Sequence, residues 1–236
     1  MRESQKKFKS PPKRYQPKGL SILYEDHDIL VVDKISGLLT VSTEKVRENT
    51  AYYLLNEYVR KGNQKSKNRI FIVHRLDRDT SGVIVFAKNE KAKQFLQKEW
   101  KSFSKTYYAV IQGKMKEKEK IITSYLAENS IHKMYSTKDP KKGKLSQTKY
   151  KVVKESKYFT LLEIELLTGR KNQIRVHLSE NGTPIVGDNV YGNLDKSAKR
   201  LTLHAASLTL FHPVTKEKME FNSEIPQYFN SLLKLR

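Results

Sequence analysis

The chain has 236 residues, with 46 Lys and Arg against 25 Asp and Glu, and its formal net charge is +21. This excess of positive charge indicates a polyanionic partner or an anionic membrane surface. The sequence contains no cysteine, which excludes disulfides, thiol catalysis and thiolate metal sites. It also lacks an apolar run long enough to predict a transmembrane helix and an apolar N-terminal segment typical of a secretory signal. We therefore expect a cytoplasmic protein that acts on nucleic acid.

The N-terminal quarter divides into a basic segment and the first regular elements. Residues 1–19 combine lysine and arginine with proline and little apolar content, which predicts a flexible basic arm ahead of one folded domain over residues 20–236. Residues 22–34 predict two strands joined by an acidic turn. The apolar spacing over 50–60 predicts a helix capped by Asn49.

A charged connection between two short strands is the first candidate site. The runs 70–73 and 83–87 are β-branched or aromatic, as strands should be, and residues 74–82 join them. Asp77 lies in this connection between two arginines, whose charges favour the ionised carboxylate that a nucleophile requires. Asp, Thr, Ser and Gly close together are also ordinary turn residues, so composition alone does not decide between the two interpretations.

The middle of the chain predicts alternating elements and basic loops. Asn89 can cap a helix that runs to about residue 103, and a β-rich strand follows over 105–113 and ends at glycine. The lysine-rich segments 114–120 and 132–149 each lie between strands and are expected to be loops on a phosphate-facing surface.

A hairpin leads into the second candidate site. Residues 147–153 and 158–167 predict its two strands, and residues 168–178 predict a helix closed by the Asn-Gly pair that follows. Ile174 and Leu178 lie one helical turn apart, and we expect both to face the core.

Two motifs carry a resemblance to a known family. His-Arg-Leu-Asp-x-x-Thr-Ser-Gly at 74–82 resembles the signature of the RluA-type RNA pseudouridine synthases. Residues 168–178 resemble the family's Thr-Gly-Arg-x-His-Gln-Ile-Arg-x-His-Leu, with Asn172 standing where histidine is usual. The similarity covers about residues 21–232. It implies an α+β pseudouridine synthase fold with a bent, mainly antiparallel sheet, flanking helices and a central catalytic cleft.

The resemblance also implies roles for individual residues. Asp77 matches the catalytic aspartate, and Arg175 matches the arginine that pairs with it. The family's Lys-x-Tyr-x-Ala selects Tyr107, which would lie against the uracil and help to remove the proton from carbon 5. Because alternate residues of a strand face opposite sides of the sheet, Tyr108 would be a packing residue.

RNA would be held by further basic side chains. Arg75 is placed to fill the space left by a uridine that has turned out of its stack. Further RNA contacts are expected from His74, Arg78 and Arg170. The substrate would be a structured ribosomal or transfer RNA, and no obligate protein partner is evident. The isomerisation formally needs no metal or cofactor, and the sequence leaves open whether the carboxylate adds to the sugar or assists loss of a ribose proton.

Two other classes of protein remain open. A non-catalytic RNA-binding or ribosome-associated protein would explain the charge, but it gives no reason for Asp77, Tyr107 and Arg175 to occur together. A metal nuclease is less well supported, because its candidate ligands have no metal-ligand spacing. Those ligands would be His74, Asp77, His177 and His204.

Overall fold

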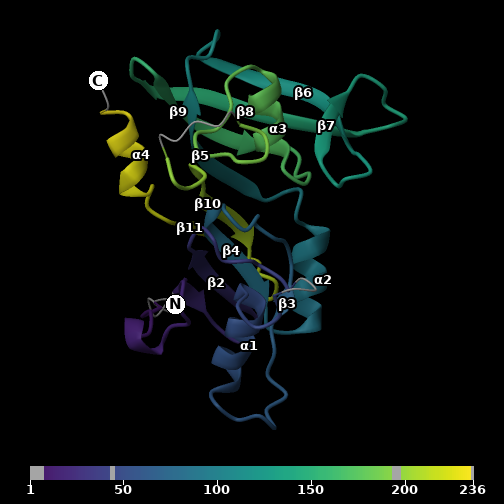
Figure 1. The fold of residues 1–236 in the computed structure, drawn as a ribbon. Helices are drawn as coiled ribbons and strands as arrows, with labels where there is room; N and C mark the ends of the chain where they lie inside the picture. Colours follow the sequence, from purple (N-terminus) through teal and green to yellow (C-terminus); the bar gives the residue numbers. More distant parts are fainter. Residues whose placement is uncertain (1–7, 43–45, 193–197, 235–236) are drawn as a thin grey trace. The chain divides into compact units, whose positions relative to one another are not determined.

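The computed structural model describes residues 8–42, 46–192 and 198–234. It divides into two compact units, and each is described here by itself (Figure 1). The first contains Met1–Trp100 and Leu210–Phe221, and the second contains Lys101–Thr209 and Asn222–Arg236.

The first unit is a small antiparallel sheet with two helices. Strand β2 pairs with β1 on one side and β4 on the other, and β3 pairs with the far edge of β4. Every residue of β4 is buried, which makes it a rigid support for the connection that precedes it. The elements are η1 (Lys13–Tyr15), β1 (Leu20–Glu25), β2 (Ile29–Lys34), α1 (Ala51–Arg60), β3 (Phe71–Ile72), β4 (Ser81–Ala87) and α2 (Glu90–Lys98).

The N-terminal segment lies along the edge of β1. The Ser10 hydroxyl donates to the Ile22 carbonyl at 2.7 Å, and the Ile22 amide donates to Gln16 Oε1 at 2.8 Å. These side chains satisfy backbone groups that an edge strand would otherwise expose. The prediction of a flexible arm over residues 1–19 did not anticipate this attachment, and residues 1–7 lie outside the described residues.

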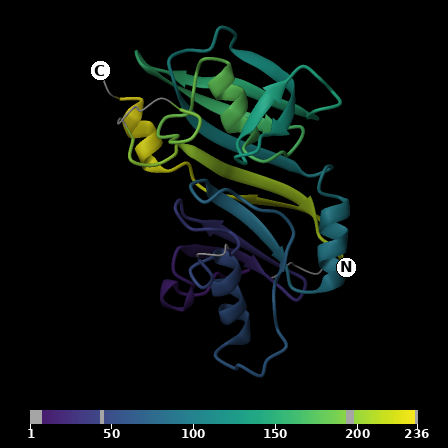
Figure 2. The same ribbon diagram turned by 45° about the vertical axis from the view of Figure 1, so that its right-hand side comes forward.

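The second unit contains a longer antiparallel sheet with strand order β10-β5-β9-β8-β6-β7. Helix α3 lies on one face of this sheet against β7 and β8 (Figures 1 and 2). The chain passes between the units within β10 and within β11. The elements of this unit are β5 (Ser104–Gln112), β6 (Glu119–Glu128), β7 (Met134–Thr137), β8 (Lys144–Glu155), β9 (Phe159–Leu166), α3 (Gln173–Glu180), most of β10 (Leu203–Phe211) and α4 (Gln227–Leu232). Strand β11 (Lys218–Asn222) lies in the first unit except for Asn222.

The two faces of this longer sheet bury different clusters. Ile174 and Leu178 of α3 pack with apolar residues of β5, β8 and β9, which confirms their predicted core position. Phe229 and Leu232 of α4 pack on a second cluster with Val110. The architecture is α+β with a mainly antiparallel sheet, as expected.

Several boundaries differ from the sequence predictions. Helix α1 is capped by Thr50, whose side chain accepts from the Tyr53 amide, and not by Asn49. Strand β7 lies within the segment 132–149 that was predicted to be a loop, because backbone pairing with β6 outweighs its short length and lysine-rich surroundings. Helix α2 ends at Lys98, short of residue 103. Helix α3 begins at Gln173, because Asn172 takes a left-handed φ of 53° and the Gln173 side chain bonds the residues ahead of it.

None of the helices in the described part of the chain is both long enough and apolar enough to cross a membrane.

Candidate active site

Asp77 lies in the connection between β3 and β4, and the backbone of this connection is held by its neighbours. The segment that follows β2 supplies hydrogen-bond donors to three carbonyl groups of the connection between β3 and β4. The Thr40 hydroxyl donates to the Leu76 carbonyl at 2.7 Å, and the Ser36 hydroxyl donates to the Asp79 carbonyl at 2.7 Å. The Arg78 carbonyl accepts from the Gly37 amide at 2.9 Å. Because the carbonyls on both sides of Asp77 are bonded, its backbone has a fixed course.

Lys34 adds a buried positive charge to this arrangement. Its ammonium donates to the carbonyls of Ile35 at 3.0 Å, Leu38 at 2.8 Å and Arg78 at 3.2 Å. Burial lowers the pKa of Lys34 to about 8, although the nearby carboxylates of Asp79 and Asp77 act in the opposite direction. The ammonium therefore ties the turn after β2 to the connection that carries Asp77.

The other basic residues of this connection differ in their surroundings. His74 Nε2 accepts from the Val85 amide at 3.2 Å, and its ring stacks on Trp100 at 4.1 Å, so His74 supports the connection. Arg78 pairs with the neighbouring Asp79 at 3.1 Å. Arg75 is exposed and makes no hydrogen bond or ion pair within the described part of the chain. RNA contacts by His74, Arg75 and Arg78 remain predictions.

Tyr107 and Tyr108 face opposite sides of the sheet, as alternation predicted. Tyr107 packs against the cluster that contains Ile174, on the face covered by α3. Tyr108 packs with the cluster of α4, and its hydroxyl donates to Glu163 at 2.6 Å. Burial and this hydrogen bond raise the pKa of Tyr108 to about 12.

Arg175 lies on α3 and is buried rather than solvated. Its Nε and Nη2 donate to the two carboxylate oxygens of Asp188, each at 2.8 Å, and its Nη1 donates to Asn172 Oδ1 at 3.0 Å. The Arg175 and Asp188 side chains are only 9% and 1% exposed. Burial alone would raise the pKa of Asp188, but Arg175 and the amides of Tyr191 and Val190 hold it below its ordinary value.

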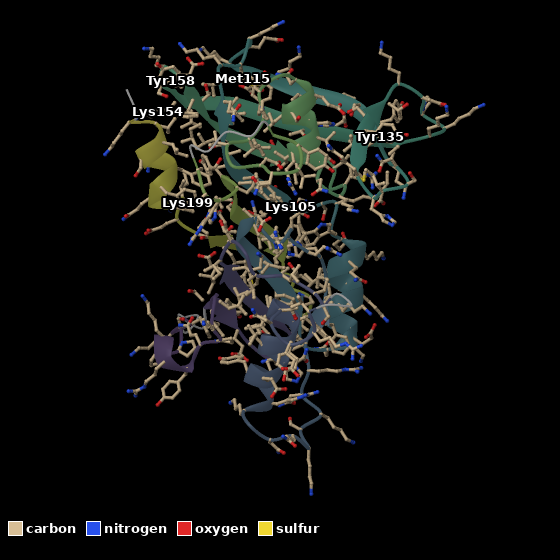
Figure 3. The ribbon with its side chains drawn as sticks, viewed as in Figure 1. Lys105, Met115, Tyr135, Lys154, Tyr158 and Lys199 are labelled. Carbon is tan, nitrogen blue, oxygen red and sulfur yellow. The ribbon has the colours of Figure 1, made fainter. Side chains whose placement is uncertain are left out.

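Arg170 and a lysine-rich hairpin form a more open part of the second unit. Arg170 is partly exposed, and its Nε donates to the Leu145 carbonyl at 3.3 Å. Tyr135 of β7 is 40% exposed, and Figure 3 shows it on the hairpin of β6 and β7. Nearby lysines are Lys133 in the turn between β6 and β7, Lys138, Lys141 and Lys142 between β7 and β8, and Lys144 at the start of β8. Aromatic and cationic groups together suit contact with RNA.

His177 is unsuited to the role of metal ligand that a nuclease would need. Its Nδ1 is bonded to the Thr148 hydroxyl and its Nε2 to the Ser124 hydroxyl, each at 2.9 Å. Burial lowers the pKa of His177 to about 4, so the ring is neutral and both nitrogens already have partners.

A second group, Asp26, Asp28 and His212, has its ligand atoms close enough for a metal ion. His212 Nδ1 accepts from the amides of Val214 and Thr215, so its Nε2 carries the proton and donates to Asp26 at 2.8 Å. Asp26 also accepts from two backbone amides and a tyrosine hydroxyl. These bonds describe a capped turn between β1 and β2 rather than a metal centre.

Residues 28–180 match the family model described as RNA pseudouridylate synthase. The match spans most of the chain and includes the Asp77 connection, β5 and the whole of α3. The chain belongs to the RNA pseudouridylate synthase family. It is therefore an RNA pseudouridine synthase, which favours a catalytic protein over a non-catalytic RNA-binding protein.

Individual relatives agree with this assignment. The synthase is 36% identical over 217 residues to the uncharacterized RNA pseudouridine synthase YhcT of Bacillus subtilis, a match that covers 90% of this chain and 71% of the relative. It is 35% identical to ribosomal large subunit pseudouridine synthase D of Buchnera aphidicola, over 92% of this chain and 72% of the relative. The solved structure of human RNA pseudouridylate synthase domain containing 1 is 26% identical, with a TM-score of 0.71 and coverage of 94% of this chain and 89% of that one.

Sequence reasoning gave no role to three residues that the structure places beside the predicted ones. Lys34 precedes an ordinary turn, and only the buried position of its ammonium reveals its bonds to the Asp77 connection. Asp188 follows a glycine turn far from Arg175 in sequence, and Asn172 departs from the family motif. The departure from the family motif at Asn172 was one available signal, because Asn172 lies three residues before Arg175 in sequence.

Proposed function

We propose that the synthase isomerises uridine to pseudouridine in cytoplasmic ribosomal RNA and that Asp77 supplies the reacting carboxylate. The fixed backbone around Asp77 is the observation that carries the assignment, because a nucleophile or base must be held in one direction to act on a bound sugar. Ribosomal RNA is favoured because the relatives from Buchnera aphidicola and Vibrio vulnificus are named ribosomal large subunit pseudouridine synthases.

The reaction exchanges one bond between sugar and base for another. The bond from ribose carbon 1′ to base nitrogen 1 breaks, the base turns, and carbon 1′ joins carbon 5. The proton leaves carbon 5, and nitrogen 1 gains a proton. Asp77 either adds to carbon 1′ or removes the carbon 2′ proton, and both routes require a directed carboxylate.

Arg175 and Tyr107 complete the proposed site. A planar guanidinium can neutralise and orient a carboxylate through two parallel hydrogen bonds, which is the role we assign to Arg175 toward Asp77. Tyr107 would lie against the uracil and help to remove the carbon 5 proton. Its place on the same sheet face as α3 supports this role.

The remaining basic residues would hold the RNA. Arg75 would fill the space left by the flipped uridine, an assignment supported by its exposure. His74, Arg78 and Arg170 would contact the RNA around it, with the lysine-rich hairpin binding phosphates.

The test is Asp77→Asn in single turnovers, with release of tritium from carbon 5 of labelled uridine as the readout. The amide keeps the shape of the side chain and loses its charge, so the rate should fall by about a thousandfold or more. RNA affinity should stay near the parental value, since its energy comes mainly from other surfaces. Asp79→Asn in the same connection is the matched control, and it should retain the rate within about threefold because its carboxylate pairs with Arg78.

The substrate assignment is tested separately with two RNA pools. Labelled ribosomal RNA lacking the modification should release tritium, while labelled transfer RNA should not. Release from transfer RNA alone would overturn the ribosomal assignment and leave the role of Asp77 intact. An Asp77→Asn protein, free of deamidation by mass spectrometry, with near-parental turnover would refute that role.

A further inference from the structure

Arg175 is held by a rigid set of acceptors that its sequence motif does not contain. The Asp188 carboxylate takes the Nε and Nη2 edge of the guanidinium, and Asn172 Oδ1 takes Nη1. The guanidinium lies over the ring of Tyr191, with the Arg175 Cζ atom 5.1 Å from the ring centroid. Each of the three guanidinium nitrogens thus donates to a named acceptor, and the plane of the group is fixed.

Asp188 is itself fixed by the turn that carries it. Its Oδ1 also accepts from the amides of Val190 and Tyr191, each at 2.9 Å. Gly187 has a φ of +76°, and a Cβ there would lie 2.1 Å from the Arg200 carbonyl oxygen, so only glycine fits this close approach. The carboxylate cannot move toward or away from Arg175 without disturbing this turn.

Asn172 has two opposite hydrogen-bonding roles. Its Oδ1 accepts from Arg175, and its Nδ2 donates to the Tyr191 hydroxyl at 3.2 Å. The same hydroxyl accepts a hydrogen bond from the Met134 amide of β7 at 3.0 Å. The left-handed backbone at Asn172 is a conformation that asparagine adopts more readily than most residues. The amide therefore links Arg175 to the β6–β7 hairpin in one orientation.

We propose that Asp188 and Asn172 are positioning residues that orient the Arg175 guanidinium for the isomerisation. The inference rests on the proposed role of Arg175. Asp188 fixes the side edge of the guanidinium, and Asn172 fixes its rotation, so the guanidinium is held in a set direction. In the proposed function, Arg175 orients the Asp77 carboxylate. Neither residue touches the uridine, and each acts through Arg175.

The test uses four single variants of the 236-residue chain. Asn172→Gly removes the amide and tolerates the left-handed backbone, and Asp188→Asn removes the charge and keeps the shape. Asn172→His supplies one accepting and one donating nitrogen in place of the amide. Asn181→Ala, at the other end of α3, is the matched control. Each variant is measured for single-turnover rate, RNA dissociation constant and melting temperature.

We expect the rate to fall roughly tenfold for Asn172→Gly and roughly a hundredfold for Asp188→Asn, because misorientation of a reacting group costs factors of this size. The RNA dissociation constants should stay within about twofold of the parent. Asn172→His should recover most of the rate, and Asn181→Ala should keep it.

A second background separates positioning from a purely structural role. In a chain that already carries Arg175→Lys, the bidentate fork is absent, so adding Asn172→Gly or Asp188→Asn should lower the rate by less than about threefold further. The proposal is wrong if the two single variants keep the parental rate, or if their losses persist undiminished in that background. If Arg175→Lys itself has the parental rate while Asp77→Asn is inactive, the role of Arg175 in the proposed function fails, and this inference fails with it.

Discussion

Removal of the Lys34 ammonium should change how the stability of the synthase depends on pH. The folded protein holds the pKa of Lys34 at about 8 instead of its ordinary 10.5, so between these values the unfolded chain binds a proton that the folded chain does not. The free energy of unfolding therefore rises with pH across this window. Below and above the window, Lys34 contributes no pH dependence. Since each pKa unit corresponds to about 1.4 kcal/mol, the rise is about 3 kcal/mol.

The assay is urea unfolding of the parent and of Lys34→Met at a series of pH values from 7 to 11. The free energy of unfolding of the parent, minus that of Lys34→Met, should increase by about 3 kcal/mol across the series. Lys91→Met, an exposed position on α2, controls for the loss of one positive charge and should follow the parent. A difference that stays constant with pH would refute the reasoning, because it would show that the three carbonyl acceptors fully offset the burial of the ammonium.

Four further substitutions test the proposed site and its surroundings. Tyr107→Phe should reduce the single-turnover rate sharply and leave RNA affinity nearly unchanged. Tyr108→Phe should lose only the hydrogen bond to Glu163, which corresponds to about 1 kcal/mol of stability in thermal unfolding. The reverse pattern would contradict the assignment of the two side chains to opposite faces. Arg175→Lys should lower the rate on the order of a hundredfold, about 2.7 kcal/mol, because an ammonium cannot form the two-bond fork, and a parental rate would dismiss this role. The pKa of His177 is about 4 in the folded protein and 6.5 ordinarily, so the unfolded chain binds a proton first as the pH falls. The free energy of unfolding should therefore drop by about 3 kcal/mol between these pH values. Matched urea titrations of His177→Gln should not show this drop.

Sequence alone determined the elements whose side chains repeat with a clear period. The alternation over 105–113 placed Tyr107 and Tyr108 on opposite faces of β5, and the helical spacing of Ile174 and Leu178 placed both in the core. Local pattern suffices here because the direction of a side chain follows from the backbone geometry of its own element. The family motif at 74–82 also identified Asp77 as a candidate in the connection between two strands.

Only the tertiary structure decided what holds these residues. The Lys34 ammonium reaches the Arg78 carbonyl across 44 positions of the chain, and Asp188 reaches Arg175 across a helix end and a turn. Hydrogen bonds of this kind join groups that are distant in sequence, and their residue types are common on protein surfaces, so no local period marks them. Whether a charge is solvated or buried against a partner depends on how the chain packs, and the packing of α3 and of β2 against their neighbours sets it here.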